Sequence, residues 1–439
     1  PRSSDLDKTI HVINHAKIEL KELNKKKGIL SRKIGAAKKQ SSPVDDLIDN
    51  VKKISQEISL INEKLRKLET TGSDKINVEC NDEPFYPSQF SERFIKESGL
   101  PLIINYSPDM NNWDNYVNSH PNSTIYHRYK FKTIVENVFG HTCHYISAEN
   151  NNIIKGIIPL VEINSRVFGH YLVSLPYFNY GGLLTDNSDI DEILFCAVND
   201  LAKSIGVDHV EYRHAVDCKE RAVRKDKVSM ILSLSDNVDS LWNEVGSKVR
   251  SQIKKANTHC LSVKIGKKDL LADFYKVFSE NMRDIGTPVY SKEFFDEILK
   301  KVKKSNIVVI YLDNKPVSTS FLIAWRNTME VPWASTLRSA NPYNVNMRLY
   351  WEMLKFSVQE GCDFFDFGRC TVDSNTYRFK KQWGAKPYQL YWHYWVKNSG
   401  SIPMINPGNP KYKLMIEIWK RLPLKLTTLI GPKVIKYLP

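Results

Sequence analysis

The predicted order of strands and helices in the body of this 439-residue chain occurs twice, and this repeat constrains its fold more than any other feature. Apolar runs predict three strands, a helix and a fourth strand in the first copy, over 144–149, 153–163, 166–176, 189–205 and 209–214. The same order returns roughly 155 residues later, over 306–312, 316–325, 329–336, 343–360 and 363–368. The sequence therefore predicts a duplicated α+β domain, with further helices over 113–119, 127–139, 247–260 and 270–284.

Residues 1–70 have a different pattern, which is typical of a helical hairpin. In the second half of this segment, apolar residues recur at alternating spacings of three and four, at Val44, Leu47, Val51, Ile54, Ile58, Ile61, Leu65 and Leu68. This is an uninterrupted heptad seam, and a looser apolar series before it can supply a facing helix. Pro43 ends the first helix and suits the first turn of the second. We expect an antiparallel coiled-coil arm with its tip near residues 38–44.

The positive charge of the chain lies at its two ends. The net charge is +14; residues 1–70 hold 16 basic against 10 acidic residues, and residues 397–439 hold 8 against 1. The middle of the chain is nearly neutral, with 39 basic against 38 acidic residues. Charge placed in this way indicates contact with a polyanion, either nucleic acid or an anionic membrane surface.

The cysteines and the hydropathy pattern indicate the compartment. Seven scattered cysteines without a C-x-x-C pair argue against a zinc site or a disulfide framework and favour a reducing compartment. We expect these cysteines to be buried as small hydrophobic residues. No apolar run reaches 18 residues and no secretory signal precedes the arm, so we predict a cytoplasmic protein without a metal site. Peripheral contact with the inner face of the membrane is a further option.

The arm carries a resemblance to a known module. The stretch LNKKKGILSRKIGAAKKQ (23–40), followed by an acidic helix start and the heptad seam, resembles the N-terminal tRNA-binding arm of seryl-tRNA synthetases. The resemblance covers about residues 5–70, and it implies that basic side chains on the rod bind the tRNA backbone. These side chains are Lys25, Lys26, Lys27, Arg32, Lys33, Lys38 and Lys39. A dimerisation or scaffolding coiled coil is the alternative.

The body resembles the FemAB-like branch of the acyltransferases with the GNAT fold, in particular the subgroup associated with the PEP-CTERM/exosortase system. The carrying stretches are WDNYVNSHPNSTIYH (113–127), SLPYFNYGGLL (174–184), SKVRSQIKKA (247–256), NMRDIGTPVYSKEFF (281–295), FFDFGRCTVDSNTYRFKKQWG (364–384) and KLMIEIWKRLPLKLTTLIGP (413–432). The resemblance implies two tandem GNAT-like domains, 85–230 and 231–397, after a linker at 71–84. It also implies transfer of an acyl or aminoacyl group to an amine. Some relatives carry a similar arm inserted within the body, so the N-terminal arm here is a departure.

The identity of the acyl donor depends on one loop. A CoA-using GNAT enzyme carries a glycine-rich R/Q-x-x-G-x-G/A loop, whose backbone N–H groups hold the pyrophosphate. At the matching point this chain reads TLRSANPYNVNMRLYW (336–351), without a glycine. We therefore expect an aminoacyl-tRNA donor held by the arm, with serine as the favoured amino acid and no bound cofactor. Acyl-CoA or an acyl carrier protein is the alternative donor, with an amino sugar or amino lipid as acceptor, and a non-catalytic tRNA-binding or scaffolding protein is a third interpretation.

The stretch FDFGRC (365–370) supplies the catalytic candidates. Amine attack on an ester or thioester needs a proton acceptor and donors for the oxyanion. Because Asp366 alternates with two phenylalanines, its carboxyl faces the other side of the strand. We expect Asp366 to hold the amine or accept its proton, with an Asp366–Arg369 ion pair as the structural alternative. Arg369, Lys380 and Lys381 are candidates for an oxyanion or an acceptor phosphate, and Trp383 for packing or substrate stacking.

Further substrate-binding candidates lie in the first copy and after it. Glu211 and Arg213 share one face of a strand and either bind acceptor groups or pair with each other, and His214 beside them is a possible base. Tyr180, Gly181 and Gly182 suggest either close backbone approach to a ligand or a plain turn. Arg250, Lys254 and Lys255 are candidates for binding a nucleotide-linked acceptor or the tRNA end, or are solvated helix charges.

The basic tail, 398–439, has an amphipathic pattern. Leu414, Met415, Ile418, Trp419 and Leu422 recur at helical spacing beside several basic residues. Such a helix either lies on an anionic membrane surface or packs on the body.

Overall fold

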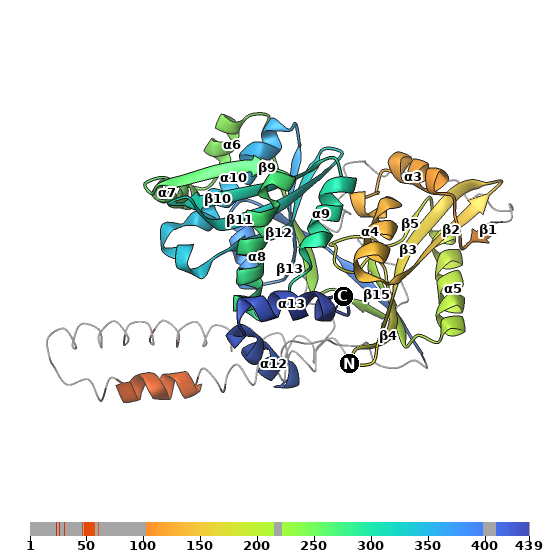
Figure 1. Cartoon of the computed structure of the whole chain (residues 1–439), viewed down its shortest axis with the longest axis horizontal. Coiled ribbons are helices and arrows are strands. Elements are labelled where there is room, and N and C mark those ends of the chain that lie inside the picture. The colour runs from red at the N-terminus through yellow and green to blue at the C-terminus, as the bar shows by residue number, and fades with distance from the viewer. Residues whose placement is uncertain are drawn as a thin grey trace, which may run out of the picture. The chain divides into compact units, whose positions relative to one another are not determined.

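The structure is a computed structural model that describes residues 102–214, 222–397 and 410–438 of the body (Figure 1). In the arm it describes only a few positions, chiefly residues 48–57. The chain divides into two compact units, Pro1–Val78 and Glu79–Pro439, which we describe separately.

Residues 48–57 of the first unit are helical, as the heptad pattern predicts. Val51 and Ile54 of the seam are half-buried there, whereas Lys52 and Lys53 are exposed. The facing helix, the tip of the hairpin and the linker at 71–84 lie outside the described residues.

The first sheet of the body has the order β1-β2-β3-β4-β6-β15-β7, and β5 pairs with β3. Helix α5 packs on one face of this sheet, while α3 and α4 cover the other. Asn187 caps the first turn of α5 through its side chain, and Gly206 ends the helix at a φ of 75°, which glycine adopts without strain. The strands are β1 (Ile103–Asn105), β2 (Thr142–Asn150), β3 (Ile153–Ser165), β4 (Gly169–Val173), β5 (Leu184–Thr185), β6 (His209–His214), β7 (Ala222–Arg224) and β15 (Tyr391–Val396). The helices are α3 (Met110–Ser119), η1 (Ile125–His127), α4 (Lys130–Phe139) and α5 (Ser188–Ile205).

The second sheet has the order β14-β8-β13-β12-β11-β10-β9. Helices α7 and α10 cover the face that carries Val308 and Ile310, while α8 and α9 cover the face that carries Ile307 and Val309. Burial on both faces explains the continuous apolar run of this strand. The strands are β8 (Lys227–Ser233), β9 (Leu261–Gly266), β10 (Ser305–Leu312), β11 (Lys315–Trp325), β12 (Thr328–Thr336), β13 (Phe364–Thr371) and β14 (Lys386–Gln389). The helices are α6 (Val238–Glu244), α7 (Ser247–Ala256), η2 (Lys268–Leu270), α8 (Leu271–Ile285), α9 (Lys292–Lys301), η3 (Arg338–Tyr343), α10 (Val345–Gln359) and α11 (Asn375–Lys381).

The duplicated α+β domain is confirmed. The order β2, β3, β4, α5, β6 of the first copy recurs as β10, β11, β12, α10, β13 in the second. Each copy contains one parallel pair, β4 with β6 and β12 with β13, joined through its helix. The two sheets lie side by side, with α4 and α9 in contact between them (Figure 1).

The two sheets exchange strands. The chain leaves the first sheet after β7 and enters the second as β8, and it returns from β14 of the second sheet to β15 of the first. The expected boundary between residues 230 and 231 therefore falls inside β8, and β15 completes a sheet whose other strands precede it by more than 160 residues. No single cut in the chain separates the two domains.

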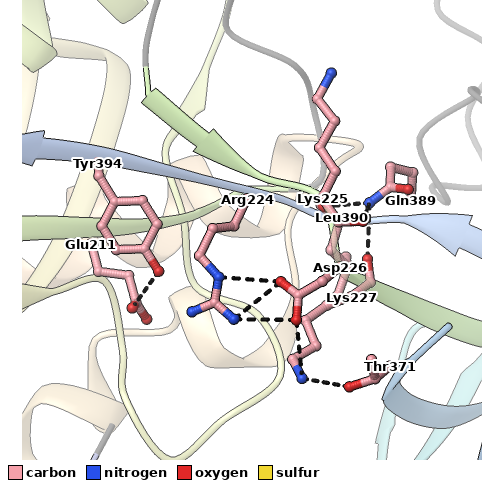
Figure 2. A network of polar contacts seen from close by, with 9 residues as sticks. All are labelled: Glu211, Arg224, Lys225, Asp226, Lys227, Thr371, Gln389, Leu390 and Tyr394. Atoms are coloured by element: carbon pink, nitrogen blue, oxygen red, sulfur yellow. Dashed lines mark hydrogen bonds and ion pairs between the residues drawn. The ribbon is translucent and has the colours of Figure 1, made fainter. Parts of the chain in front are cut away.

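A polar network holds the two crossings together (Figure 2). The side-chain amide of Gln389 donates to the carbonyls of Lys225 and Lys227, at 3.0 Å each, so the return crossing is tied to the outward one. Asp226 pairs with both Arg224 and Lys227. The bonds of Gln389 therefore join the outward connection to the return connection.

The tail packs on the body with one side and exposes the other. It forms α12 (Pro410–Arg421) and α13 (Leu424–Ile435), both in contact with α8. The carbonyls of Lys436 and Tyr437 accept hydrogen bonds from Tyr177 and Tyr171 of the first domain. Leu414, Met415, Ile418 and Leu429 remain 53–66% exposed. Among the described residues, no helix is long and apolar enough to cross a bilayer.

The prediction that the cysteines are buried is correct for only some of them. Cys143, Cys362 and Cys370 are buried, whereas Cys196 and Cys260 are exposed, which corrects the prediction for these two. Cys80 and Cys218 lie outside the described residues.

Candidate active site

A cleft of about 720 Å³, including its open mouth, lies between the two domains of the body. The first domain contributes the segment around η1 and Tyr180, and the second domain contributes β11, β12, β13 and the β14–β15 crossing. The lining residues are Pro121, Ser123, Thr124, Ile125, Tyr180, Ser229, Ile323, Trp325, Arg326, Asn327, Thr328, Glu330, Asp366, Tyr388, Gln389 and Leu390. Apolar atoms provide most of the exposed surface of this lining, although most of its side chains are polar, and two of them carry carboxyl groups, Glu330 and Asp366.

The register of β12 against β13 places the two carboxyl groups together. Glu330 and Asp366 are direct partners in this parallel ladder, and theirs is the last pair before the strands separate. Directly opposed residues on neighbouring strands point to the same face, so both carboxyl groups face the cleft. Both side chains are almost fully buried, at 7% and 1% exposure. Two buried acids side by side are costly unless they share a proton or bind a cation.

Asp366 and two hydroxyl groups form a closed triangle of contacts. Tyr180 Oη lies 2.5 Å from both Asp366 Oδ2 and Ser229 Oγ, and Ser229 Oγ lies 3.0 Å from Asp366 Oδ1. The two hydroxyls supply two hydrogens for three contacts, so the third contact uses either a shared hydroxyl hydrogen or a proton on Asp366. Burial raises the pKa of Asp366, although the bonds from Tyr180, Ser229 and the Gly368 N–H oppose the rise.

Glu330 accepts two hydrogen bonds from the first domain. Tyr126 donates its hydroxyl to Oε2 at 2.8 Å, and Asn179 donates its amide to Oε1 at 2.6 Å. Burial, followed by the neighbouring Asp366 carboxylate, raises the pKa of Glu330 to about 8. The two acids titrate as a pair, and this pair retains a proton at neutral pH. At neutral pH the pair then carries one proton and one negative charge, and this charge can bind an ammonium ion.

A bulge in β13 determines the backbone conformation of the residues that follow Asp366. Gly368 has a φ of 73°, and Phe367 and Gly368 of β13 there oppose the single residue Met230 of β8. Lys380 holds this bulge, because its ammonium donates to the carbonyls of Gly368 and Arg369 at 2.7 and 3.0 Å. Burial lowers the pKa of Lys380 to about 8. In this structure Lys380 supports the backbone beside Asp366 and does not line the cleft.

Arg369 lies away from the cleft, against the first domain. Its guanidinium stacks on Trp392 at 5.2 Å, and its buried Nη1 has no partner among the described residues. Burial and then the nearby Arg213 lower its pKa to about 10. The expected Asp366–Arg369 ion pair is absent from the described residues, since Asp366 uses Tyr180, Ser229 and Gly368 instead.

The first copy forms the ion pair that the second lacks. Arg213 Nε donates to Glu211 Oε1 at 2.8 Å, and Tyr394 donates to Glu211 Oε2 at 2.8 Å. Burial opposes ionisation of Glu211, but the charge of Arg213 and these two bonds outweigh it and hold the pKa of Glu211 below its usual value. Both partners are buried and neither lines the cleft. This geometry favours a structural role for Glu211 and Arg213 over substrate binding.

The two glycines of the 174–184 segment lie against other residues of the protein, not against the cleft. A Cβ on Gly182 would lie 2.5 Å from the Arg213 carbonyl oxygen, and one on Gly181 would lie 2.5 Å from Leu175. Both glycines therefore let this segment pack against β6 and its own turn. His214 at the end of β6 accepts from the Leu183 N–H and packs against Phe195.

Four other candidates lie apart from the carboxyl pair. Arg250 donates to the carbonyls of Trp242, Asn243 and Val245, so it caps the C-terminal end of α6. Trp383 belongs to the core of the second domain, with 2% exposure. Lys254 and Lys381 are exposed on helices. None of the four lines the cleft.

Glu330, its partners Tyr126 and Asn179, and Ser229 beside Asp366 were not predicted from the sequence. Glu330 stands between Met329 and Val331 in a strand that is otherwise apolar or small, and an acid in such a strand was an available signal. Tyr126 and Asn179 acquire a role through the packing of the first domain on the second, and Ser229 through the pairing of β8 with β13, and no local pattern contains either.

Residues 245–388, which run from α7 to β14, match the family model described as acetyltransferase (GNAT) domain. This segment is a GNAT acyltransferase domain. It contains Glu330 and Asp366, and the expectation of an acyltransferase domain of this class is therefore confirmed.

Among solved structures, the chain is similar to FemX at 14% identity, with a TM-score of 0.52, over 72% of this chain and all of that one. A tandem GNAT protein from the clavulanic acid biosynthesis pathway also matches, at 9% identity and a TM-score of 0.44, over 70% of this chain and all of that one. The likeness to FemX confirms the FemAB-like fold of the body.

A serine–tRNA ligase of Chlamydia abortus is 32% identical over 108 residues, which are 24% of this chain and 25% of that protein. The chain thus spans about a quarter of the length of this ligase. A sequence likeness to seryl-tRNA ligases, expected from the arm, is present in the chain.

The raised pKa of the carboxyl pair predicts a loss of stability on alkalinisation. Between about pH 5 and about pH 8 the folded protein keeps a proton that the unfolded chain has released, so the free energy of unfolding falls as pH rises. Replacing Glu330 by Gln removes this contribution and flattens the fall. Urea unfolding at a series of pH values tests this, with the exposed Glu360→Gln as control. An equal pH dependence in Glu330→Gln and the wild type would contradict the shared proton.

Proposed function

We propose that the chain is an aminoacyltransferase that moves an amino acid from an aminoacyl-tRNA to the amine of an acceptor bound in the interdomain cleft. The observation that carries this proposal is the carboxyl pair of Glu330 and Asp366 at the buried base of the cleft. An acceptor amine arrives mostly as an ammonium ion at neutral pH and must lose a proton before it attacks. The pair offers both negative charge to bind the ammonium and a site for its proton.

In the proposed aminoacyl transfer, the carboxyl pair of Glu330 and Asp366 accepts the proton that the amine releases. Glu330 takes one proton from the bound ammonium, and the neutral amine attacks the ester carbonyl carbon of the donor. The C–N bond forms, the ester C–O bond breaks, and the ribose oxygen leaves as a hydroxyl with the second proton from the nitrogen. Asp366, held by Tyr180 and Ser229, stays beside Glu330 and shares the added proton until it reaches solvent. Positioning of the two reactants supplies much of the remaining rate.

The donor assignment rests on the arm and on the start of α10. The likeness to a serine–tRNA ligase supports tRNA as the carrier, with serine as the favoured amino acid. The glycine-free stretch 336–351 folds as η3 followed by α10 and leaves no flexible glycine loop there to surround a pyrophosphate. Acyl-CoA or a carrier protein remains the competing donor because the GNAT domain is shared with acetyltransferases.

Replacing either acid by its amide should slow aminoacyl transfer more than tenfold. In Glu330→Gln the pair loses its proton acceptor, and in Asp366→Asn it loses the group that shares the proton. Binding of tRNA should not change, because both acids lie inside the body. The assay is acceptor-dependent release of labelled amino acid from tRNA, beside filter binding of the same tRNA.

The exposed Asp373→Asn, just beyond β13, is the matched control and should keep wild-type rates. If labelled aminoacyl-tRNA stays intact with every amine while acetyl-CoA is consumed, the donor assignment fails and the acyl-CoA alternative takes its place. If neither donor is consumed, the chain is a binding protein and the enzymatic proposal fails.

Substitutions in the arm should weaken tRNA binding and flatten its salt dependence. Alanine at Lys25, Lys26, Lys27, Arg32 and Lys33 removes up to five basic groups that pair with phosphates, and the salt slope falls by about one for each. Five exposed lysines of the body provide a control of equal charge, namely Lys203, Lys276, Lys292, Lys300 and Lys315. Unchanged affinity together with loss of a dimer would assign the arm to scaffolding.

The exposed side of the tail supports a peripheral membrane role as part of this proposal. Leu414, Met415 and Ile418 of α12 are 53–64% exposed in a segment, 397–439, that holds 8 basic residues and 1 acid. Apolar side chains beside lysines suit an anionic bilayer, where each basic residue contributes about 1 kcal/mol.

Replacing these three residues by Ser should abolish flotation with phosphatidylglycerol vesicles. Phosphatidylcholine vesicles should bind little in either case, because they lack the charge. Serine at Ile153 and Val167, which are 61% and 80% exposed, is the control. Equal flotation of both variants would assign α12 to packing alone.

A further inference from the structure

We infer that the interdomain cleft selects acceptors whose ammonium group is carried on an uncharged, apolar body, such as a long-chain or aromatic amine. This inference rests on the proposed function and adds the chemical class of the acceptor. It follows from three features of the cleft: the charge at its base, the commitment of its cationic residue, and the composition of its walls.

The charge at the base of the cleft is negative. Glu330 and Asp366 lie at its base, and Arg326 is the one basic residue among the described residues of its lining. Arg326 donates to the carbonyls of Asn118, Pro121 and His120 at 2.8–3.0 Å, which uses three of its five N–H donors. These bonds join the β11–β12 turn to the first domain and hold the guanidinium in place. Two N–H donors remain for a phosphate or carboxylate on the acceptor, which the two acids of the base would repel.

Five apolar side chains of the cleft walls come from both domains and stand beside polar ones such as Thr124 and Asn327. Pro121 and Ile125 contribute from the first domain, and Ile323, Trp325 and Leu390 from the second. Trp325 is fixed by the hydrogen bond from its Nε1 to the Ser123 carbonyl at 3.0 Å, so the indole presents a set surface. Apolar walls stabilise apolar groups by removing them from water.

Together these features describe a site with an anionic base and an apolar shaft. An alkyl or aryl ammonium ion satisfies both parts at once. An amine that carries an anion close to the ammonium does not, since the anion loses its hydration and is repelled by the carboxyl pair. The cleft thus discriminates among amines by the charge and polarity of the groups beside the nitrogen.

Binding without any donor tests this inference separately from the transfer reaction. The probes are methylamine, butylamine, hexylamine, hexanol and 6-aminohexanoate, titrated calorimetrically into the full-length protein at pH 7. We expect affinity to rise about three- to fourfold for each added methylene, as burial of each CH₂ implies. Hexanol and 6-aminohexanoate should bind at least tenfold more weakly than hexylamine, because each lacks one of the required features.

Two variants test the two parts of the site separately. Glu330→Gln should weaken the binding of all amines about equally, while Trp325→Gln should weaken hexylamine binding far more than methylamine binding and so reduce the dependence on chain length. Asp373→Asn should match the wild type. Equal binding of hexylamine and 6-aminohexanoate, or no dependence on chain length, would overturn the inference, even if transfer from aminoacyl-tRNA occurs. Conversely, selective hexylamine binding without any transfer would leave the acceptor site standing and refute the proposed reaction.

Discussion

The parallel pairing of β12 with β13 is the constraint on which the candidate site depends. It sets Glu330 directly beside Asp366 at the last paired position of the ladder. Two carboxyl groups held this close in a buried site cannot both ionise at neutral pH, so the site retains a proton. Hydrogen bonds from the first domain offset the free-energy cost of burying the two carboxyl groups. Tyr126 and Asn179 donate to Glu330, and Tyr180 donates to Asp366. The first domain thus completes the polar contacts of the second.

This arrangement explains why the two domains are interlocked. The pair is useful only if donors from both domains hold their positions, and a shift of one sheet against the other would leave buried acids without partners. The crossings at residues 224–227 and 389–391, tied together by Gln389, limit such a shift. Gln389 and Leu390 also line the cleft, so the connection between the domains is part of the wall of the site.

Much of the fold was predictable because the local periodicity of apolar residues indicates its strands and helices. The repeated strand and helix order follows from apolar patterning, and Asp366 was found by its alternation with Phe365 and Phe367. The exchange of β15 into the first sheet was not predictable, because strand pairing across more than 160 residues leaves no local signal. Glu330 was missed for a related reason: its significance comes from register with Asp366, not from its own neighbours in the chain.

Acidic residues at the same position of the two copies have different surroundings. In the first copy the last pair of the parallel ladder joins Val173 to Glu211, and Arg213 follows on the same face and neutralises the acid. In the second copy the corresponding pair joins Glu330 to Asp366, and the bulge at Gly368 places Arg369 against Trp392 instead. One ladder therefore ends in a neutral ion pair and the other in two acids with a shared proton. Among the described residues, the second copy is the one that directs acidic side chains into the cleft, and the first copy supplies hydrogen bonds to them from Tyr126, Asn179 and Tyr180.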